Sequence, residues 1–146
     1  MSYKKIDISE LELNPFETIG KDWLLISAKK GDQVNTMTAS WGGIGVIWNK
    51  NVITAYIRPQ RYTREFVDES DYFTITCFKG YKKELGVLGS KSGRDGDKIK
   101  EVGFDVEMLN NQPTFKQGTM CFTCKKLYRG KIEPEGFIDK DLDIKN

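Results

Sequence analysis

Short stretches with strand-like patterns, each interrupted by a turn, constrain the fold of this chain more than any other sequence feature. The clearest stretch, residues 72–78 (YFTITCF), alternates threonine with apolar side chains, as a half-buried strand does. Asn49–Lys50 separates two apolar runs and predicts a hairpin turn. Arg58–Pro59 ends the second run, because proline removes a donor from the hydrogen-bond ladder. Strands are expected at residues 23–29, 35–40, 46–48, 51–57, 72–78, 104–109 and 118–132, with a polar turn at 110–113.

Only short helices fit between these strands. In the first of them Thr63 is the expected N-cap, and Phe66 and Val67 lie on the expected buried side. Gly103 can end the last of them in a left-handed conformation. The expected helices cover residues 62–70, 82–88 and a segment from Asp95 or Gly96 to Gly103.

This order of elements contains no alternation of strands with long helices, no internal repeat and no linker. Many short strands with brief helical crossings are typical of an antiparallel β-barrel that carries a few helices. The sequence therefore predicts one domain over residues 1–146, mainly β with short helices.

The composition is that of a folded domain, with 38% hydrophobic and 12% aromatic residues. The 23 basic residues are interspersed with 21 acidic ones, which argues against nucleic-acid binding because that needs a clustered basic face. No apolar run approaches the roughly 20 residues that cross a bilayer. The first five residues lead into polar residues, with no signal-peptide apolar stretch. We therefore expect a cytoplasmic protein without membrane association.

The chain has no histidine and three cysteines. Without histidine, Ser-His-Asp and Cys-His nucleophile systems and the usual histidine metal sites are excluded, so a cofactor would have to carry any difficult chemistry. The cysteines form no disulfide framework, which fits a reducing compartment. Cys121 and Cys124 form a C-x-x-C pattern, but residues three apart in a strand point to opposite faces. We therefore interpret the cysteines as ordinary thiols and expect no metal site.

The segment 37–41 (MTASW) runs into a glycine-rich stretch at Gly42, Gly43 and Gly45. These glycines lack the G-x-G-x-x-G spacing, and no long helix follows them. We interpret them as a backbone turn that lets a flat ligand approach closely. An ordinary glycine-rich hairpin end explains the same residues equally well.

A second candidate segment places Arg58 and Arg61 on either side of a rigid proline turn, just before the helix that begins near Thr63. Arginines and free helical N–H groups are good partners for phosphate oxygens. The alternative is that both arginines pair with nearby surface acids in exposed ion pairs worth about 0–1 kcal/mol each. The acids in reach are Glu65, Asp68 and Glu69.

A third candidate segment, residues 89–98 (GSKSGRDGDK), combines glycines, hydroxyl residues and three cations ahead of a helix. This chemistry suits an anion, although the order of residues is not that of a P-loop. A solvated flexible loop has the same composition.

Taken in order, these segments resemble the flavin reductase-like, FMN-binding split-barrel family, and within it the small single-domain flavoredoxin-like proteins. The likeness runs from Asn35 to Gly103 and continues more weakly to Tyr128. Several blocks in the right order are more specific than any one block. The blocks are residues 35–43, 57–63, 73–78, 80–85 and 90–98.

The resemblance implies an FMN site near the interface of a homodimer. It places the isoalloxazine ring against Thr38, Ala39, Ser40 and Trp41. The ribityl phosphate would lie by Arg58, Arg61, Tyr62 and Thr63. The remaining wall and further anion contacts would come from Phe78, Lys91, Ser92, Gly93 and Arg94.

The implied function is an NAD(P)H-dependent flavin reductase or flavoredoxin-like electron carrier that passes electrons through FMN to an acceptor. Flavin needs no protein nucleophile or base, so the lack of histidine is no obstacle. By the same likeness the chain lacks the family's closing C-terminal segment after residues 139–144. The alternatives are a non-catalytic flavin-binding protein (storage, sensor or degenerate) and, from another class, a small barrel that stacks nucleic-acid bases on its aromatic rings.

Overall fold

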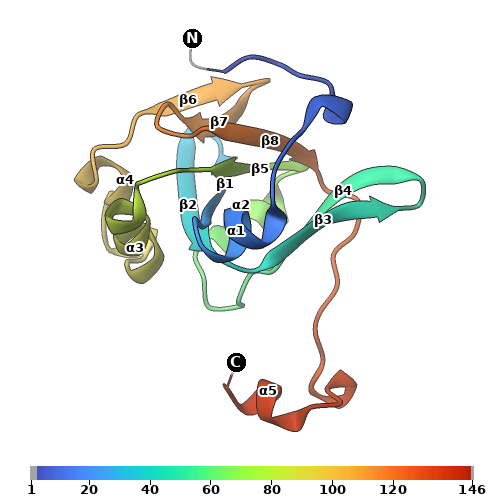
Figure 1. Cartoon of the computed structure of the whole chain (residues 1–146). Coiled ribbons are helices and arrows are strands. Elements are labelled where there is room, and N and C mark those ends of the chain that lie inside the picture. Colours follow the sequence, from blue (N-terminus) through green and yellow to red (C-terminus); the bar gives the residue numbers. More distant parts are fainter. Residues whose placement is uncertain (1–2, 146) are drawn as a thin grey trace.

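The computed structural model describes residues 3–145, so Met1, Ser2 and Asn146 lie outside the described residues, and with them part of the N-terminal start considered above. Its described strands form a four-stranded antiparallel sheet in the order β2-β1-β5-β8 and two hairpins, β3–β4 and β6–β7 (Figure 1). The strands are β1 (Leu24–Lys30), β2 (Gln33–Ala39), β3 (Gly42–Ile47), β4 (Lys50–Ala55), β5 (Tyr72–Cys77), β6 (Val106–Leu109), β7 (Gln112–Phe115) and β8 (Met120–Lys125). The mainly β prediction is confirmed.

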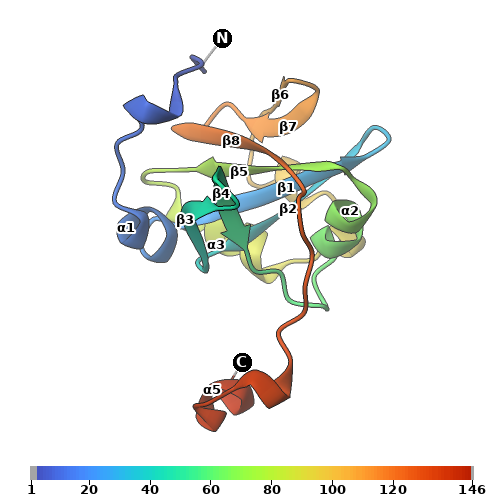
Figure 2. The same cartoon turned by 90° about the vertical axis from the view of Figure 1, so that its right-hand side faces the viewer.

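All the helices are short, as expected. They are η1 (Ile8–Glu10), α1 (Pro15–Gly20), α2 (Thr63–Glu69), α3 (Lys82–Ser90), η2 (Gly93–Asp95), α4 (Lys98–Glu101), η3 (Pro134–Gly136) and α5 (Lys140–Lys145). Figures 1 and 2 show that α5 lies apart from the sheet and the hairpins, at the end of an extended C-terminal arm.

The four-stranded sheet is covered on both faces, which explains why residues 24–28 of β1 are all buried. One face packs against α2 and the β3–β4 hairpin, and the other packs against α3, α4 and the β6–β7 hairpin. Burying each large apolar side chain contributes about 1.5–3 kcal/mol. The first core contains Ile26, Met37, Phe66 and Ile75 among others, and the second contains Leu25, Phe78, Leu85, Leu88, Ile99, Phe104 and Phe115.

Buried hydroxyl groups join the second face of the sheet to the elements that cover it. Thr74 Oγ1 donates to the carbonyl of Pro113 at 2.5 Å, and Thr76 Oγ1 lies 2.8 Å from Thr114 Oγ1. These bonds fasten β5 to β7. The threonines that predicted a half-buried strand are therefore fully buried, and their hydroxyls are satisfied by a second hairpin.

The expectation of a turn at Gly42–Gly45 is wrong. These residues are strand β3, with Gly43 opposite Thr54 and Gly45 opposite Val52. A Cβ atom at Gly42 would lie 2.9 Å from the Thr54 carbonyl oxygen, so this glycine permits a close approach of the two strands.

The hairpin turn lies one residue earlier than predicted. Trp48 and Asn49 occupy its centre with φ of 54° and 59°. Lys50 already belongs to β4, which ends at Ala55 and not at the expected residue 57. Two central residues with left-handed φ give the twist that suits a two-residue hairpin. Here the turn geometry outweighs the steric cost of a positive φ for a bulky residue such as tryptophan.

The polar turn predicted at residues 110–113 is shorter than expected. Only Asn110 and Asn111 turn, with φ of 51° and 64°, and β7 starts at once at Gln112. A strand containing Pro113 was not predicted, because proline weakens a strand assignment. The predicted strand at 118–132 is β8 alone: it ends at Lys125, and residues 126–133 carry no secondary structure.

The helix predictions hold apart from their ends. Phe66 and Val67 are buried in α2, as predicted, but Tyr62 and not Thr63 occupies the N-cap position. Thr63 is buried and accepts a hydrogen bond from Asn35 Nδ2 at 2.8 Å. The third helix is shorter than expected, and Gly103 after it has the predicted left-handed φ, 76°.

Phe115 tests the second core. It is 0% exposed, whereas Phe16 is 84% exposed. We expect Phe115→Ala to lower the free energy of unfolding by about 3–5 kcal/mol, because it removes a buried ring and leaves a cavity. Phe16→Ala should change it by less than about 0.5 kcal/mol. Urea unfolding of the two variants measures both values, and equal losses would contradict this core.

Candidate cofactor site

The C-terminal end of α3 lies close against strand β2. Thr38 Oγ1 donates to the Leu85 carbonyl at 2.5 Å. A Cβ atom at Gly89 would lie only 3.1 Å from Thr38 Cβ, so glycine allows the helix to sit this close. As a result, the last carbonyls of α3 lie beside the strand end that the sequence assigned to the flavin.

Arg61 donates a hydrogen bond to one of these carbonyls. Its Nη1 donates to the Gly89 carbonyl at 3.1 Å. Its Nη2 is buried and has no hydrogen-bond partner among the described residues. Burial, and then the positive charge of Arg58, lower the pKa of Arg61. A buried guanidinium nitrogen without an acceptor is costly, so this atom fits an incoming anion.

Lys98 is the second cation at this helix end, and it is only 4% exposed. Its Nζ donates to the carbonyls of Leu88 and Lys91, both at 2.9 Å. Burial, and then the charge of Arg61, lower the pKa of Lys98 to about 8. Carbonyls at a helix C-terminus favour cations, but they supply no full negative charge.

The nearby acids pair with other cations. Glu65 pairs with Arg94 and Glu101 pairs with Lys91. Within residues 3–143 the two cations at the end of α3, Arg61 and Lys98, make no salt bridge. The two cations at this corner therefore lack a counter-charge, and the donor set suits a phosphate dianion.

The alternative that Arg58 and Arg61 pair with the surface acids Glu65, Asp68 or Glu69 is therefore wrong for the described residues. Glu69 pairs with Lys30, and Asp68 pairs with Arg64 and Arg129. Arg58 instead stacks on the Trp41 ring, with its guanidinium carbon 4.9 Å from the ring centroid.

The loop of residues 91–97 lies against the same corner. A Cβ atom at Gly93 would fall 2.1 Å from Asn35 Oδ1. Ser92 Oγ accepts from the Arg94 backbone N–H at 3.1 Å, and the Arg94 guanidinium stacks over Tyr62 at 4.5 Å. Lys91 and Arg94 are brought to the site, but each is held by a carboxylate, so their role as anion contacts stays a prediction.

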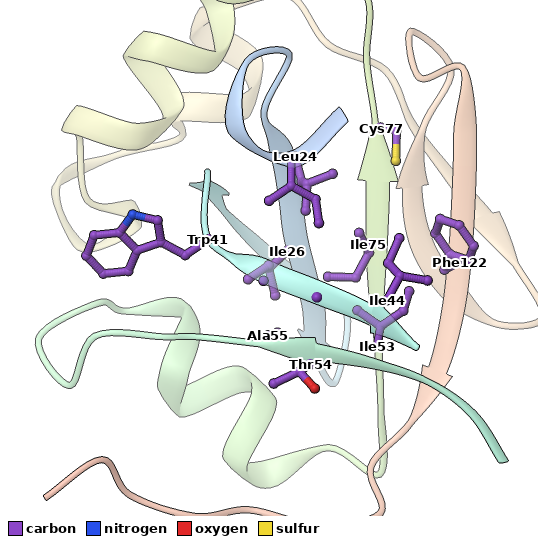
Figure 3. A pocket seen from close by; sticks show the side chains of 13 residues that line it. Leu24, Ile26, Trp41, Ile44, Ile53, Thr54, Ala55, Ile75, Cys77 and Phe122 are labelled. Atoms are coloured by element: carbon purple, nitrogen blue, oxygen red, sulfur yellow. The ribbon is translucent and has the colours of Figure 1, made fainter. Parts of the chain in front are cut away.

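The segment predicted to lie against the isoalloxazine ring, residues 38–41, is partly exposed. Trp41 is 44% exposed and Ser40 is exposed, whereas Ala39 is buried at the end of β2. Trp41 lies at one end of a narrow apolar cavity and Phe122 at the other (Figure 3). The cavity encloses about 10 Å³, room for about one water molecule. A flavin ring would therefore have to lie on the outer side of this segment.

Phe78 does not reach the exposed wall. It is 1% exposed and stacks on Phe104 with ring centroids 5.4 Å apart, inside the second core. The sequence therefore brings together residues from β2, from the loop before α2 and from the loop after α3, while Phe78 supports them from within the core.

Two members of this corner were missed individually, Lys98 and Gly89. Lys98 was predicted only as part of a cationic loop, and no local pattern marks it as the lysine that turns inward. Cys121 and Cys124 are free thiols on opposite sides of β8, as predicted: Cys121 lies near Thr76, and Cys124 packs on the first core.

Within residues 3–145, no cluster of three or more potential metal ligands occurs, and no helix is long and apolar enough to span a membrane.

Comparison with known proteins identifies the fold. No protein-family model and no curated protein matches this sequence. Solved structures match instead. An FMN-binding domain of a flavin reductase-like enzyme from Shewanella baltica OS155 aligns with a TM-score of 0.68 and 22% identity, over 79% of this chain and 62% of that one. The chain thus spans less than two thirds of that protein's length.

Two flavoredoxins align as well. The one from Methanosarcina acetivorans has a TM-score of 0.67 and 21% identity, over 89% of this chain and 68% of its own. The one from Desulfovibrio vulgaris (Miyazaki F) has a TM-score of 0.69 and 20% identity, over 88% and 69%. The chain therefore has the fold of the FMN-binding, flavin reductase-like split barrels, as the resemblance implied.

The unpaired cations predict an anion effect on stability. Inorganic phosphate should raise the Tm of the protein, because a ligand that binds only the folded state stabilises it by mass action. Arg61→Met should lose most of that rise. Arg129→Met is the matched control, since its guanidinium already pairs with Asp68 outside this corner. Equal phosphate-induced shifts in both variants, measured by calorimetry, would contradict the assignment.

Proposed function

We propose that this chain binds FMN, with the phosphate at Arg61 and Lys98 and the isoalloxazine ring along residues 38–41. The observation that carries the proposal is the buried, unpartnered Nη2 of Arg61 beside a second cation without a counter-charge. The fold supports the choice of ligand, because structures with this fold include proteins described as FMN-binding. The remaining sequence-predicted contacts, Tyr62, Thr63 and the 91–94 loop, surround the same corner.

We further propose that the protein is an oxidoreductase that takes electrons from NAD(P)H and delivers them to an acceptor. FMN, when bound, supplies a ring nitrogen that accepts hydride, so no protein nucleophile or base is required. The protein's part is to bind, orient and stabilise charge. Arg58, exposed and stacked on Trp41, supplies positive charge beside the ring position, where it would favour a reduced flavin.

Thr38 has a structural part in this proposal. Its hydroxyl proton is committed to the Leu85 carbonyl, so it positions α3 rather than moving a proton. Trp41 offers a broad apolar ring to the ligand, and Arg58 holds that ring in place by a cation–π contact. All three cysteines are free, which supports a reducing cytoplasmic setting.

We also propose that the protein acts as a homodimer. Large apolar side chains are exposed on the β3–β4 hairpin and on the C-terminal arm, where Trp48 and Tyr128 contact each other with ring centroids 6.4 Å apart. Tyr128 is 76% exposed and Ile138 is 98% exposed. An apolar surface of this kind marks an interaction site.

The dimer proposal predicts that Trp48→Ser combined with Tyr128→Ser weakens self-association by at least about tenfold, because interface energy concentrates in buried aromatic anchors. Sedimentation equilibrium measures the constant, with Phe16→Ser as a control on a separate exposed ring. A wild-type protein that stays monomeric at high concentration would contradict the proposal.

A visible spectrum tests the function itself. Purified protein, supplied with FMN and passed through a desalting column, should retain the flavin absorption band. Adding NADH or NADPH without oxygen should then bleach the absorption band of the bound flavin. If the protein retains flavin but neither nicotinamide reduces it, the protein is a non-catalytic flavin-binding protein. If the protein retains no flavin, the proposal is overturned.

A further inference from the structure

The C-terminal arm, residues 125–143, leads away from the sheet and the hairpins (Figure 2). Near its start the arm is fastened to α2, because Arg129 Nε lies 2.8 Å from the Asp68 carboxylate. Further along, the side chains of Ile132 and Ile138 are exposed. The start of the arm is therefore held by the body of the protein, while apolar side chains beyond it face solvent, as at an interaction site.

Charge is distributed unevenly along the arm. Residues 125–131 (KKLYRGK) contain four cations and no acid, whereas residues 133–143 (EPEGFIDKDLD) contain five acids and one lysine. Among the side chains of residues 3–143, none of these five acids forms a salt bridge. A segment with one positive and one negative half is complementary to a second copy of itself that runs antiparallel.

We propose that two copies of this chain pair through their arms, which run antiparallel and cross at Ile132. The basic half of each arm then lies on the acidic half of the other. This inference rests on the homodimer proposed above, to which it adds the direction and the register of the contact. It does not depend on flavin binding.

The residue order around Ile132 supports this register. Lys131 lies opposite Glu133 of the second copy, and a two-fold axis through Ile132 makes the same pair twice. A parallel arrangement would instead place Lys131 against Lys131, and like charges directly opposite each other are destabilising. The outer pairs of the antiparallel register also match, two by opposite charge and one by apolar character: Arg129 with Glu135, Lys125 with Asp139, and Leu127 with Phe137.

The chain's own hairpin contacts the opposite face of the arm. In an extended segment successive side chains point to opposite faces, and all the pairs above stand at odd-numbered positions. Tyr128 stands at an even position and contacts Trp48 at the tip of the β3–β4 hairpin, with ring centroids 6.4 Å apart. A Cβ atom at Gly130 would lie 2.7 Å from the Tyr128 ring, so glycine lets this ring fold back over the arm. The even face therefore rests on the hairpin at Tyr128, and Lys131 and Glu133 stand on the other face.

The inner pair, Lys131 with Glu133, matters most for the contact. Residues 126–133 carry no helix or strand, so this pair fits the arm as it stands, whereas the outer pairs need the single turn of η3 to straighten. Arg129 already pairs with a carboxylate of α2, while Lys131 forms no salt bridge among the described side chains. Exposed ion pairs are individually weak, so the apolar contacts supply affinity and the charges set direction and register.

Charge reversal at the inner pair tests the proposal. At low ionic strength, Lys131→Glu and Glu133→Lys should each weaken self-association at least about tenfold, because each puts like charges opposite one another at two places. The double variant Lys131→Glu/Glu133→Lys should associate as tightly as the wild type. An equimolar mixture of the two single variants should form heterodimers, because opposite charges then face each other again. Sedimentation velocity measures each association constant.

The matched control is Lys116→Glu, which makes the same change of charge at an exposed lysine outside the arm. Association of both single variants as tight as that of Lys116→Glu, or a mixture that stays monomeric, would overturn the arm pairing. If the wild type still dimerises in that case, the homodimer proposal stands without the arm pairing, and a wild type that remains monomeric overturns both. Recovery in the double variant and in the mixture would confirm the pairing, since proteins that had failed to fold would not recover.

Discussion

The close contact between strand β2 and the end of helix α3 is the constraint on which the candidate site depends. Thr38 fastens the helix by donating to the Leu85 carbonyl, and Gly89 removes the side chain that would hold the two elements apart. This contact fixes the direction of the last carbonyls of α3. Those carbonyls in turn accept hydrogen bonds from the guanidinium of Arg61, in the loop before α2, and from the ammonium of Lys98, on α4.

The electrostatic arrangement at this corner has a cost without a ligand. Within the part of the chain that the structure describes, the buried Lys98 and the half-buried Arg61 form no salt bridge with a carboxylate, although four acids of the neighbouring helices pair with other basic residues. Such an arrangement is unfavourable for an empty protein and favourable for one that binds a dianion. Uncompensated positive charge at such a site lowers the folding stability of the empty protein and raises its affinity for phosphate. The partly exposed Trp41 offers the apolar surface that a flavin ring needs.

The sequence predicted the parts of the fold that depend on alternation. Thr74 and Thr76 alternate with apolar residues and lie in the expected strand, and Phe66 and Val67 mark the buried side of α2. The strand at Pro113 was missed because local propensity opposes it, and only packing against β5 explains it. The glycines at 42–45 were assigned to a turn because glycine has two uses, a turn and a close strand pair, and sequence does not separate them.

The sequence also predicted which segments meet at the site, but not how their charges pair. Arg61 and Arg94 stand in similar basic segments, yet the structure leaves one without an acid and gives the other Glu65. Pairing depends on distances across the fold, which the local pattern does not contain. Lys98 was therefore hidden among the cations of its loop until its burial was known.

The most direct test of the central claim is a crystal structure of the protein soaked with FMN. The account predicts the phosphate within hydrogen-bonding distance of Arg61 Nη2, with the Lys98 ammonium as its second positive partner. A phosphate bound elsewhere, with Arg61 Nη2 still lacking an acceptor, would contradict it.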